Sequence, residues 1–345
     1  MATKLRAHVS TNAALAKGAA PTSEEIFVRN DSVSLCFLLN RRARAMRVID
    51  FRAGASPAKK LFAQSIARRE RIEKVIVLVE RDECANWGRL GFAREGNIPG
   101  FYRRSDAFIM GYLVPPPNAP VVAAKPALGS ARGSLSESGV FAVGRHGVFT
   151  VEEEIEEEPT PPVSNARAER TVTHARRIGK ELSSSPALAS KLAPATPAEM
   201  NKRLAQAAKE ARALTGFEPF GRDVSRDDVI VTAKGHADVV IGAEVQRCYG
   251  NAFLEVLTTP RDDRELRLLA SAIGATCDRL LAAEIVCAFA LAPVDDVKMS
   301  AAYAANGFRR TGLLRQHLRL KRPSGSSERV DALLWSRKLA TPQDE

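Results

Sequence analysis

Residues 80–96, ERDECANWGRLGFAREG, and residues 296–312, DVKMSAAYAANGFRRTG, follow one pattern. Each stretch has an aromatic residue, a Gly-Phe pair that begins four positions later, and another glycine four positions after the phenylalanine. The matching positions are Trp87, Gly91-Phe92 and Gly96 in the first stretch, and Tyr303, Gly307-Phe308 and Gly312 in the second. A left-handed glycine ends a helix, and the phenylalanine then packs into the core as the next strand begins. The pattern therefore predicts a helix-to-strand junction in each half of the chain.

The elements that lead to these junctions recur in the same order. In the first half, apolar runs predict strands at 32–39, 45–51 and 74–79, a helix at 56–72, and a short helix that ends at Gly91. In the second half we expect strands at 228–233, 238–248, 252–259 and 284–291, with helices at 261–282 and 297–306. Asp106-Ala107 and Asp331-Ala332 then lead into a terminal strand in each half. Two similar halves favour an internal duplication.

The composition changes sharply between these halves. From residue 115 the chain is rich in Pro, Ala, Gly and Ser, followed by an acidic run at 152–158 and a basic stretch at 167–180. Such segments have little apolar surface to bury, and their like charges repel one another. We therefore expect a flexible tail at 1–23, a first domain at 24–115, a disordered linker at 116–195 and a second domain at 196–341.

The second domain is expected to begin with a helix. Thr196 is a typical N-cap, Pro197 suits the first helical position, and Glu199 completes a capping box. Gly216 is the predicted stop.

In context, the repeated pattern resembles the C-terminal motif of the GNAT acetyltransferases: Asn, six residues, Tyr, three residues, Gly-Phe, three residues, Gly. The second copy has Tyr303 in the Tyr position and Asp296 in the Asn position, whereas the first has Trp87 and Glu80 there. The sequence that follows the first copy resembles the end of acetyltransferases that act on β-lysine and related small amines; it reads GNIPGFYRRSDAFIMGYLV. The resemblance covers about two thirds of the chain.

The resemblance implies two acyl-CoA acyltransferase domains, each a mostly antiparallel mixed sheet that is flanked by helices and splayed near its centre. The order of elements independently favours an α/β or α+β sandwich. The two domains are expected to pack as a pseudo-dimer within the chain, with a homo-oligomer as the other arrangement. The implied activity is transfer of an acetyl group from acetyl-CoA to a primary amine of a small molecule or a protein.

The resemblance also assigns catalytic residues. The family tyrosine is commonly the general acid that returns a proton to the departing thiolate, and Tyr303 can do this, since a phenol has a pKa near 10. Trp87 cannot, because an indole N–H does not ionise usefully. Glu244 and Glu255 lie on strands that in this family face the substrate cleft, so either is a candidate general base; the competing interpretation is a solvated glutamate on an edge strand.

The cofactor side is divided between the halves. The family holds the pyrophosphate with a glycine-containing loop between a strand and a helix N-terminus. In FRAGAS, residues 51–56, the candidates are Arg52, Gly54, Ala55 and Ser56, and Asp296 is assigned to the cofactor side in the second half. The second-half loop, TTPRDDRELR, has no glycine and has two aspartates that would repel phosphate. Two hypotheses stay open: an active site assembled across both halves, or a duplicated fold that has partly lost catalysis and acts as a binding scaffold.

Charge and composition restrict other functions. The formal charge of +11 favours a polyanionic partner, yet the 51 basic residues are scattered and no nucleic-acid-binding signature accompanies them, so a solvated basic surface or a polyphosphate cofactor is expected instead. The five cysteines form no CxxC pattern, which argues against a metal site. His236 and His317 are predicted surface residues. No signal peptide and no apolar stretch of roughly 18 residues is present, so we expect a cytoplasmic protein without a membrane span.

Overall fold

The computed structural model describes residues 9–10, 23–30, 33–41, 43–52, 54, 56–115, 141–142, 148–149, 166–185, 188–212, 214–215, 224–235, 238–321 and 326–340. The first half contains β1 (Val9–Ser10), β2 (Ser23–Arg29), β3 (Ser34–Asn40), β4 (Ala45–Asp50), α1 (Pro57–Arg69), β5 (Lys74–Val79), α2 (Cys84–Arg89), β6 (Ala93–Ile98) and β7 (Ala107–Leu113). Between the halves lie β8 (Phe141–Ala142), β9 (Val148–Phe149) and α3 (Ala166–Ser183). The second half contains β10 (Lys191–Pro194), α4 (Pro197–Lys209), β11 (Leu214–Thr215), β12 (Ser225–Thr232), β13 (Val239–Gln246), β14 (Asn251–Val256), α5 (Asp263–Ala282), β15 (Cys287–Pro293), α6 (Val297–Ala305), β16 (Arg309–Lys321) and β17 (Ser327–Lys338).

Within these residues, one large mixed sheet runs through both halves. The strand order from β2 is β2-β3-β4-β5-β7-β6, and it continues as β16-β17-β15-β14-β13-β12. The second series repeats the first in reverse, so β6 and β16 meet at the centre of the sheet. Corresponding strands of the two halves are separated from the centre by the same number of strands. The expected mixed, mostly antiparallel sheet is confirmed, but the halves share that sheet instead of forming two separate ones.

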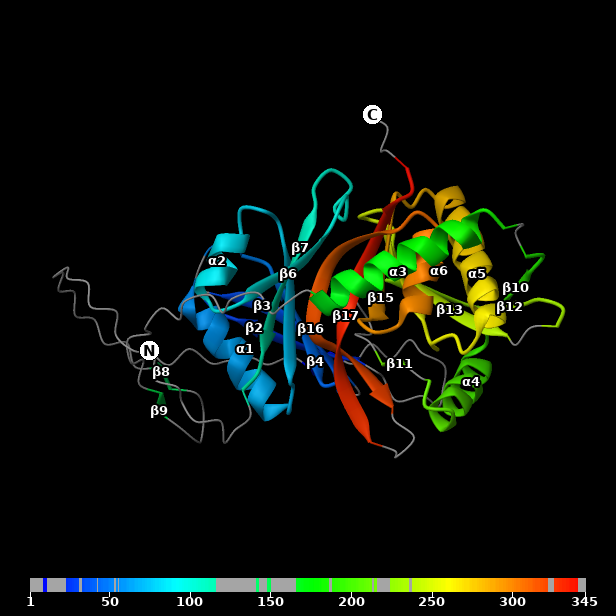
Figure 1. Cartoon of the computed structure of the whole chain (residues 1–345). Coiled ribbons are helices and arrows are strands. Elements are labelled where there is room, and N and C mark those ends of the chain that lie inside the picture. The colour runs from blue at the N-terminus through cyan, green and yellow to red at the C-terminus, as the bar shows by residue number, and fades with distance from the viewer. Residues whose placement is uncertain are drawn as a thin grey trace.

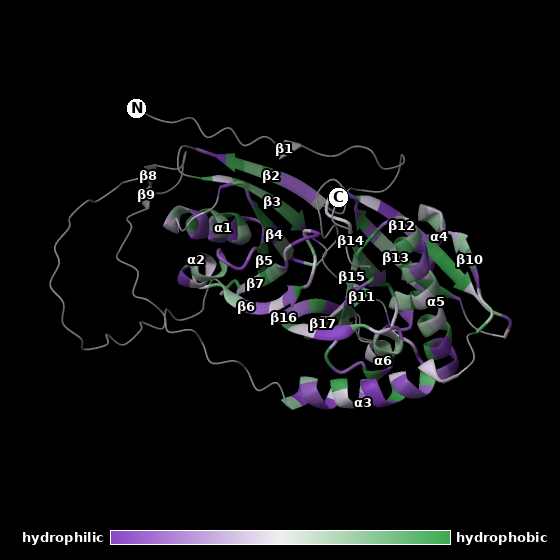
Figure 2. Ribbon diagram, turned by 90° about the horizontal axis from the view of Figure 1, so that it is seen from above, coloured by the Kyte–Doolittle hydropathy of each residue, from purple (hydrophilic) through white to green (hydrophobic). Residues whose placement is uncertain are grey.

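The sheet bends at its centre, so the two half-sheets face each other across a common interior (Figure 2). Helices α1 and α2 cover the outer face of the first half, while α5, α6 and α3 cover the outer face of the second (Figure 1). The inner faces meet in one apolar cluster that includes Ile76 and Ile109 from the first half, and Phe289 and Leu334 from the second. The two halves are therefore joined by a shared core as well as by the sheet.

Each half contains one parallel pair of neighbouring strands that diverges. In the first half, β4 and β5 pair as far as Val48 and Val77, and in the second half β14 and β15 pair as far as Leu254 and Ala290. The strands continue beyond the last pair, so the sheet opens at their carboxyl ends. This confirms the predicted splay.

The repeated glycines do what the sequence pattern predicts. Gly91 and Gly307 have φ values of 82° and 75°, in the left-handed region, and each follows the end of a helix. The amide of Phe92 donates to the carbonyl of Trp87 at 3.1 Å, and the amide of Phe308 donates to that of Tyr303 at 3.2 Å. The aromatic residue and the Gly-Phe pair thus form the same closed turn in both halves.

Gly96 and Gly312 form the junction between the halves. They are register partners in the pairing of β6 with β16. A Cβ on Gly312 would lie 2.6 Å from the backbone of both Glu95 and Gly96, and a Cβ on Gly96 would lie 3.0 Å from the Cα of Gly312. The two backbones can approach this closely because neither residue has a side chain.

Polar side chains are also buried in the interior. Lys74 Nζ lies 2.5 Å from Glu95 Oε1, and both side chains are shielded from solvent. Burial lowers the pKa of Lys74 and raises that of Glu95, while their contact opposes both shifts. His317 is fully buried, so the predicted surface position is wrong; burial, with the charges of Lys74 and Arg329, lowers the pKa of His317 to about 3. His236 lies outside the described residues.

Two predictions about the middle of the chain need correction. Residues 166–183 form the helix α3, which packs on α6, so the linker expected at 116–195 does not extend through this stretch. Ala168, Val172 and Ala175 are buried at helical spacing, a signal that the charge-rich composition obscures. The capping box of α4 at Thr196 and Glu199 is confirmed, but α4 ends at Lys209, before the predicted stop. No described helix is long and apolar enough to cross a membrane.

The junction can be tested by adding one methyl group. Gly312→Ala should destabilise the protein by about 1–3 kcal/mol, because the new Cβ meets backbone atoms that cannot move aside. Gly88→Ala is the matched control: nothing lies within 4 Å of its added Cβ, and replacing a helical glycine should stabilise by roughly 0.5–1 kcal/mol. Urea unfolding of both variants measures the difference, and equal stabilities would contradict a tight junction.

Candidate active site

The carboxyl ends of β14 and β15, where the two strands stop pairing, are the more promising of two candidate sites. In α/β sheets, ligands bind outside the carboxyl ends of parallel strands, where neighbouring connections leave the sheet. Here β14 leads into α5 and β15 leads into α6, and the two strands have already diverged. We call the place where β14 and β15 cease to pair the second crevice, and its counterpart at β4 and β5 the first crevice.

Tyr303 of α6 brings an unpaired hydroxyl to this region. The side chain is fully buried against Phe308 and Trp335, yet its hydroxyl has no hydrogen-bond partner among the described residues. The hydroxyl of Ser300, one helical turn earlier on α6, is also buried and unpaired within that part of the chain. A buried hydroxyl without a partner costs about 1–3 kcal/mol, so two of them on one helix face need an explanation.

Two carboxylates act on Tyr303. Burial raises the pKa of Tyr303, and the negative charges of Asp296 and Glu255 raise it further, so the phenol stays protonated at neutral pH. Asp296 is the N-cap of α6: its Oδ1 accepts the amide of Met299 at 2.8 Å, and burial raises its pKa. Glu255 lies on β14 just past the last residue paired with β15, and its Oε2 accepts a hydrogen bond from Arg226 Nη2 at 2.8 Å. Tyr303, Asp296 and Glu255 thus gather around the second crevice.

Glu244 lies elsewhere. It is a buried residue of β13, in register with Phe253, and its charge acts on Arg47 of β4 in the other half. Burial lowers the pKa of that arginine and Glu244 opposes the shift. The position of Glu244 is therefore inside the core between the halves.

A short stretch of the chain covers the edge of β14 at the second crevice. Arg212 and β11 form this covering segment. The amide of Leu214 donates to the carbonyl of Leu257 at 3.1 Å, and the amide of Thr259 donates to the carbonyl of Arg212 at 3.2 Å. On its other side β11 pairs with β16. Backbone groups left open by the divergence of β14 from β15 are therefore already hydrogen bonded.

Ion pairs hold the covering segment to the start of α5. Arg212 contacts Glu265 and Glu210 at 2.9 Å each, and Arg261 contacts the same two glutamates at 2.6 and 3.4 Å. Glu265 also accepts the amide of Arg261 at 2.8 Å, and Asp262 caps the amide of Glu265. Amides that could bind an anion at this helix start therefore face carboxylates of the chain itself.

The first crevice is closed by a lysine. Lys59 of α1 is buried, and its ammonium donates to Asp50 Oδ2 at 2.5 Å, to the carbonyl of Arg52 at 2.5 Å and to that of Gly54 at 2.7 Å. A loop that cradles phosphate presents amides, whereas this one turns carbonyls toward a cation. The predicted phosphate loop therefore binds a side chain of its own helix.

Glu83 occupies the anion position of the same loop. The amide of Gly54, which has a φ of 102°, donates to both carboxylate oxygens of Glu83 at 3.2 and 3.3 Å. Arg52 is exposed, and its amide donates to Asp50. Ser56 is the N-cap of α1 but makes no side-chain capping bond, and Ala55 lies outside the described residues. As arranged, the first crevice does not fit a pyrophosphate.

The predicted site residues therefore form two separate groups. Arg52, Gly54 and Ser56 belong to the first crevice, and Tyr303 to the second, with β7, β6, β16 and β17 between them in the sheet order. Lys59, Arg212 and Ser300 were not among the predicted site residues. The spacing of Ser300 and Tyr303 on one helix face was a usable signal, whereas nothing local marks Lys59 or Arg212 as the groups that close a crevice.

In comparisons with known proteins, no family model matches the chain, and no curated protein matches it. Among solved structures, spermidine N-acetyltransferase from Vibrio cholerae in complex with CoA and spermine is 10% identical, covering 44% of this chain and 96% of its own, with a TM-score of 0.35. The ribosomal-protein-S18-alanine N-acetyltransferase from Escherichia coli is 13% identical, covering 45% of this chain and 97% of its own, with a TM-score of 0.33.

Removing the lysine tests the closure of the first crevice. Lys59→Met should destabilise the protein by about 3–5 kcal/mol, because it leaves the Asp50 carboxylate buried and two carbonyls without a partner. Lys60→Met changes the neighbouring, less buried lysine and should cost less than about 1 kcal/mol. Urea unfolding gives the free energy of unfolding of both variants. A decrease below about 1 kcal/mol for Lys59→Met, as expected for Lys60→Met, would show that the contacts of Lys59 do not stabilise the first crevice.

Proposed function

We propose that the second half of this chain is an acyltransferase that transfers an acetyl group from acetyl-CoA to the primary amine of a small molecule or a protein. The observation that carries the proposal is the buried, unpaired hydroxyl of Tyr303 beside the second crevice. A phenol kept protonated by burial holds a proton for a leaving group formed next to it. Acetyl-CoA supplies the acetyl group as a thioester, and the thiolate that departs takes the phenol proton and leaves as the thiol.

Glu255 is the proposed residue for the amine. Its present partner, the Arg226 guanidinium, is a cation, which supports a position suited to a positively charged acceptor. Asp296 caps α6 and so fixes the helix that carries Tyr303. The reversed strand order supports the internal duplication expected from the sequence, with the first half as a closed copy.

The phosphate end of acetyl-CoA fits the second crevice only after the covering segment has moved. In the arrangement described, Leu214 and Arg212 use the edge of β14, and Glu265 uses the amide of Arg261. We therefore propose that donor binding displaces the covering segment. The closed copy in the first half lacks both the tyrosine and an open loop, so one donor site per chain is expected.

The tyrosine is tested by removing one oxygen atom. Tyr303→Phe should lower kcat by about 10²- to 10⁴-fold, since a positioned general acid contributes that much, with thermal stability unchanged or higher because an unpaired buried hydroxyl is lost. Steady-state acetylation of a panel of primary amines, spermidine included, measures kcat. Tyr112→Phe is the control, because its hydroxyl accepts a hydrogen bond from Gln64 in the first half and its loss should leave kcat intact. Full activity of Tyr303→Phe would refute the assignment.

The covering segment is tested by binding. Arg212→Ala removes the contacts to Glu210, Glu265 and the Thr259 carbonyl, and should tighten acetyl-CoA binding tenfold or more in calorimetry, about 1.4 kcal/mol. Arg203→Ala removes the same charge from α4, where Arg203 pairs with Asp238, and should leave the affinity unchanged.

If neither the natural protein nor Arg212→Ala binds acetyl-CoA, the acyltransferase proposal fails, and the chain is a scaffold with an acetyltransferase-like fold. If the natural protein already binds as tightly as the variant, the covering segment is no barrier.

A further inference from the structure

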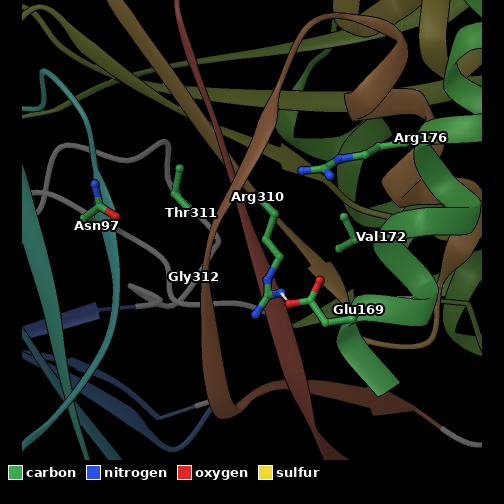
Figure 3. Close-up of a pocket in the computed structure, with 7 residues that line it drawn as sticks. All are labelled: Asn97, Glu169, Val172, Arg176, Arg310, Thr311 and Gly312. Carbon is green, nitrogen blue, oxygen red and sulfur yellow. Dashed lines mark hydrogen bonds and ion pairs between the residues drawn. The ribbon is translucent and has the colours of Figure 1, made fainter. Parts of the chain in front are cut away.

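An open pocket lies away from both crevices, where the two halves meet. Its volume is about 480 Å³, within the range of small-ligand pockets. It lies between α3, β16 and β6, as Figure 3 shows. The lining residues are Asn97, Glu169, Val172, Arg176, Arg310, Thr311 and Gly312. We call it the seam pocket, because β6 belongs to the first half and β16 to the second.

The α3 wall of the seam pocket is held in place by packing. Glu169, Val172 and Arg176 follow one another at three- and four-residue spacing and therefore share one side of the helix. The adjoining side of α3 packs so tightly on α6 that a Cβ on Gly179 would lie 3.0 Å from Ala304. The packing of α3 on α6 thus fixes the backbone that carries the pocket-lining side chains of α3.

The charges of the seam pocket do not cancel. The side chain of Arg310 is 13% exposed and forms an ion pair with Glu169. Arg176 has no hydrogen bond or ion pair with any residue that the structure describes, and in Figure 3 its guanidinium extends from α3 over the pocket toward the strands. Two guanidinium groups and one carboxylate leave a net positive charge in the lining.

We propose that the seam pocket binds a small molecule through an oxyanion group, a carboxylate or a phosphate, and that Arg176 is its main contact. A guanidinium presents a planar fork of donors that matches either group in two parallel hydrogen bonds. Arg310, the amide of Asn97 and the hydroxyl of Thr311 line the same space and supply further donors. Val172 gives one apolar wall for the body of the ligand.

The same lining excludes other ligands. An unneutralised arginine repels ammonium groups, so the seam pocket does not suit the amine acceptor proposed for the second crevice. Among the described lining residues only Glu169 has a carboxylate, and it is already paired with Arg310, so these residues do not form a site for a divalent cation. An anion that binds Arg176 gains a charge-assisted contact without breaking one to any residue that the structure describes.

The test compares two neighbouring arginines of α3. Calorimetric titration of the full chain with sodium phosphate and with sodium citrate at low salt should show saturable binding of at least one of them. Arg176→Ala should weaken that binding tenfold or more, and Arg176→Lys should weaken it less, because the charge remains but the fork is lost. Arg177→Ala removes the same charge from a residue that is exposed, as Arg176 is, but does not line the pocket, and it should change the dissociation constant by less than about twofold.

The outcomes separate this site from the second crevice and from general charge effects. Equal weakening by Arg176→Ala and Arg177→Ala would mean nonspecific attraction to a basic helix and would overturn the proposal, as would the absence of saturable binding. Arg212→Ala alters the second crevice and not the seam pocket, so the anion binding that depends on Arg176 should persist in that variant. An anion affinity that follows Arg212 and ignores Arg176 would place the anion in the second crevice instead.

Discussion

The close approach of Gly96 and Gly312 is the constraint on which the rest of the structure depends. A sheet can pass from one half to the other there only because two backbones meet without side chains between them. The bend then turns the two inner faces toward each other, and their apolar residues form one core. Polar groups buried between the halves need hydrogen-bond partners from the opposite half. Arg329 of β17 donates to the carbonyls of Ala43 and Arg44 and to the carboxylate of Glu73 in the first half.

The same splay has been closed in two different ways. Diverging parallel strands leave backbone groups unpaired, and buried backbone groups need partners. The first crevice meets this need with Lys59, whose buried position on α1 makes the closure part of the core. The second uses Arg212 and β11, held by ion pairs that are partly exposed and therefore weaker and sensitive to salt. Local side-chain chemistry, and not the shared strand order, thus decides how each crevice is closed.

The fold was largely predictable because its signals are local. The helix stops at Gly91 and Gly307, the capping box at Thr196 and the buried strands all follow from neighbouring residues. The site was less predictable because its contacts are distant in sequence. The charge of Glu244 acts on Arg47 in the other half, and Arg212 reaches Glu265 on the next helix, α5; neither interaction leaves a trace in residue spacing. Helix α3 was missed for another reason: its buried alanines and valine carry little hydrophobicity among so many arginines.

Joining two similar halves in one chain removes the requirement that they stay alike. A homodimer repeats every substitution about its axis, so both crevices and both sides of the junction would change together. Here the pattern places Asn97, one residue after Gly96, where the second half has Leu313 after Gly312. Among the described residues, α3 covers this junction on the side of the second half only. The seam pocket depends on that asymmetry, because its asparagine comes from one half and its arginines come from α3 and from the other. A polar pocket with different residues on its two sides can therefore form near the centre of the sheet when the halves have diverged. Two identical halves would present the same residues to each other there.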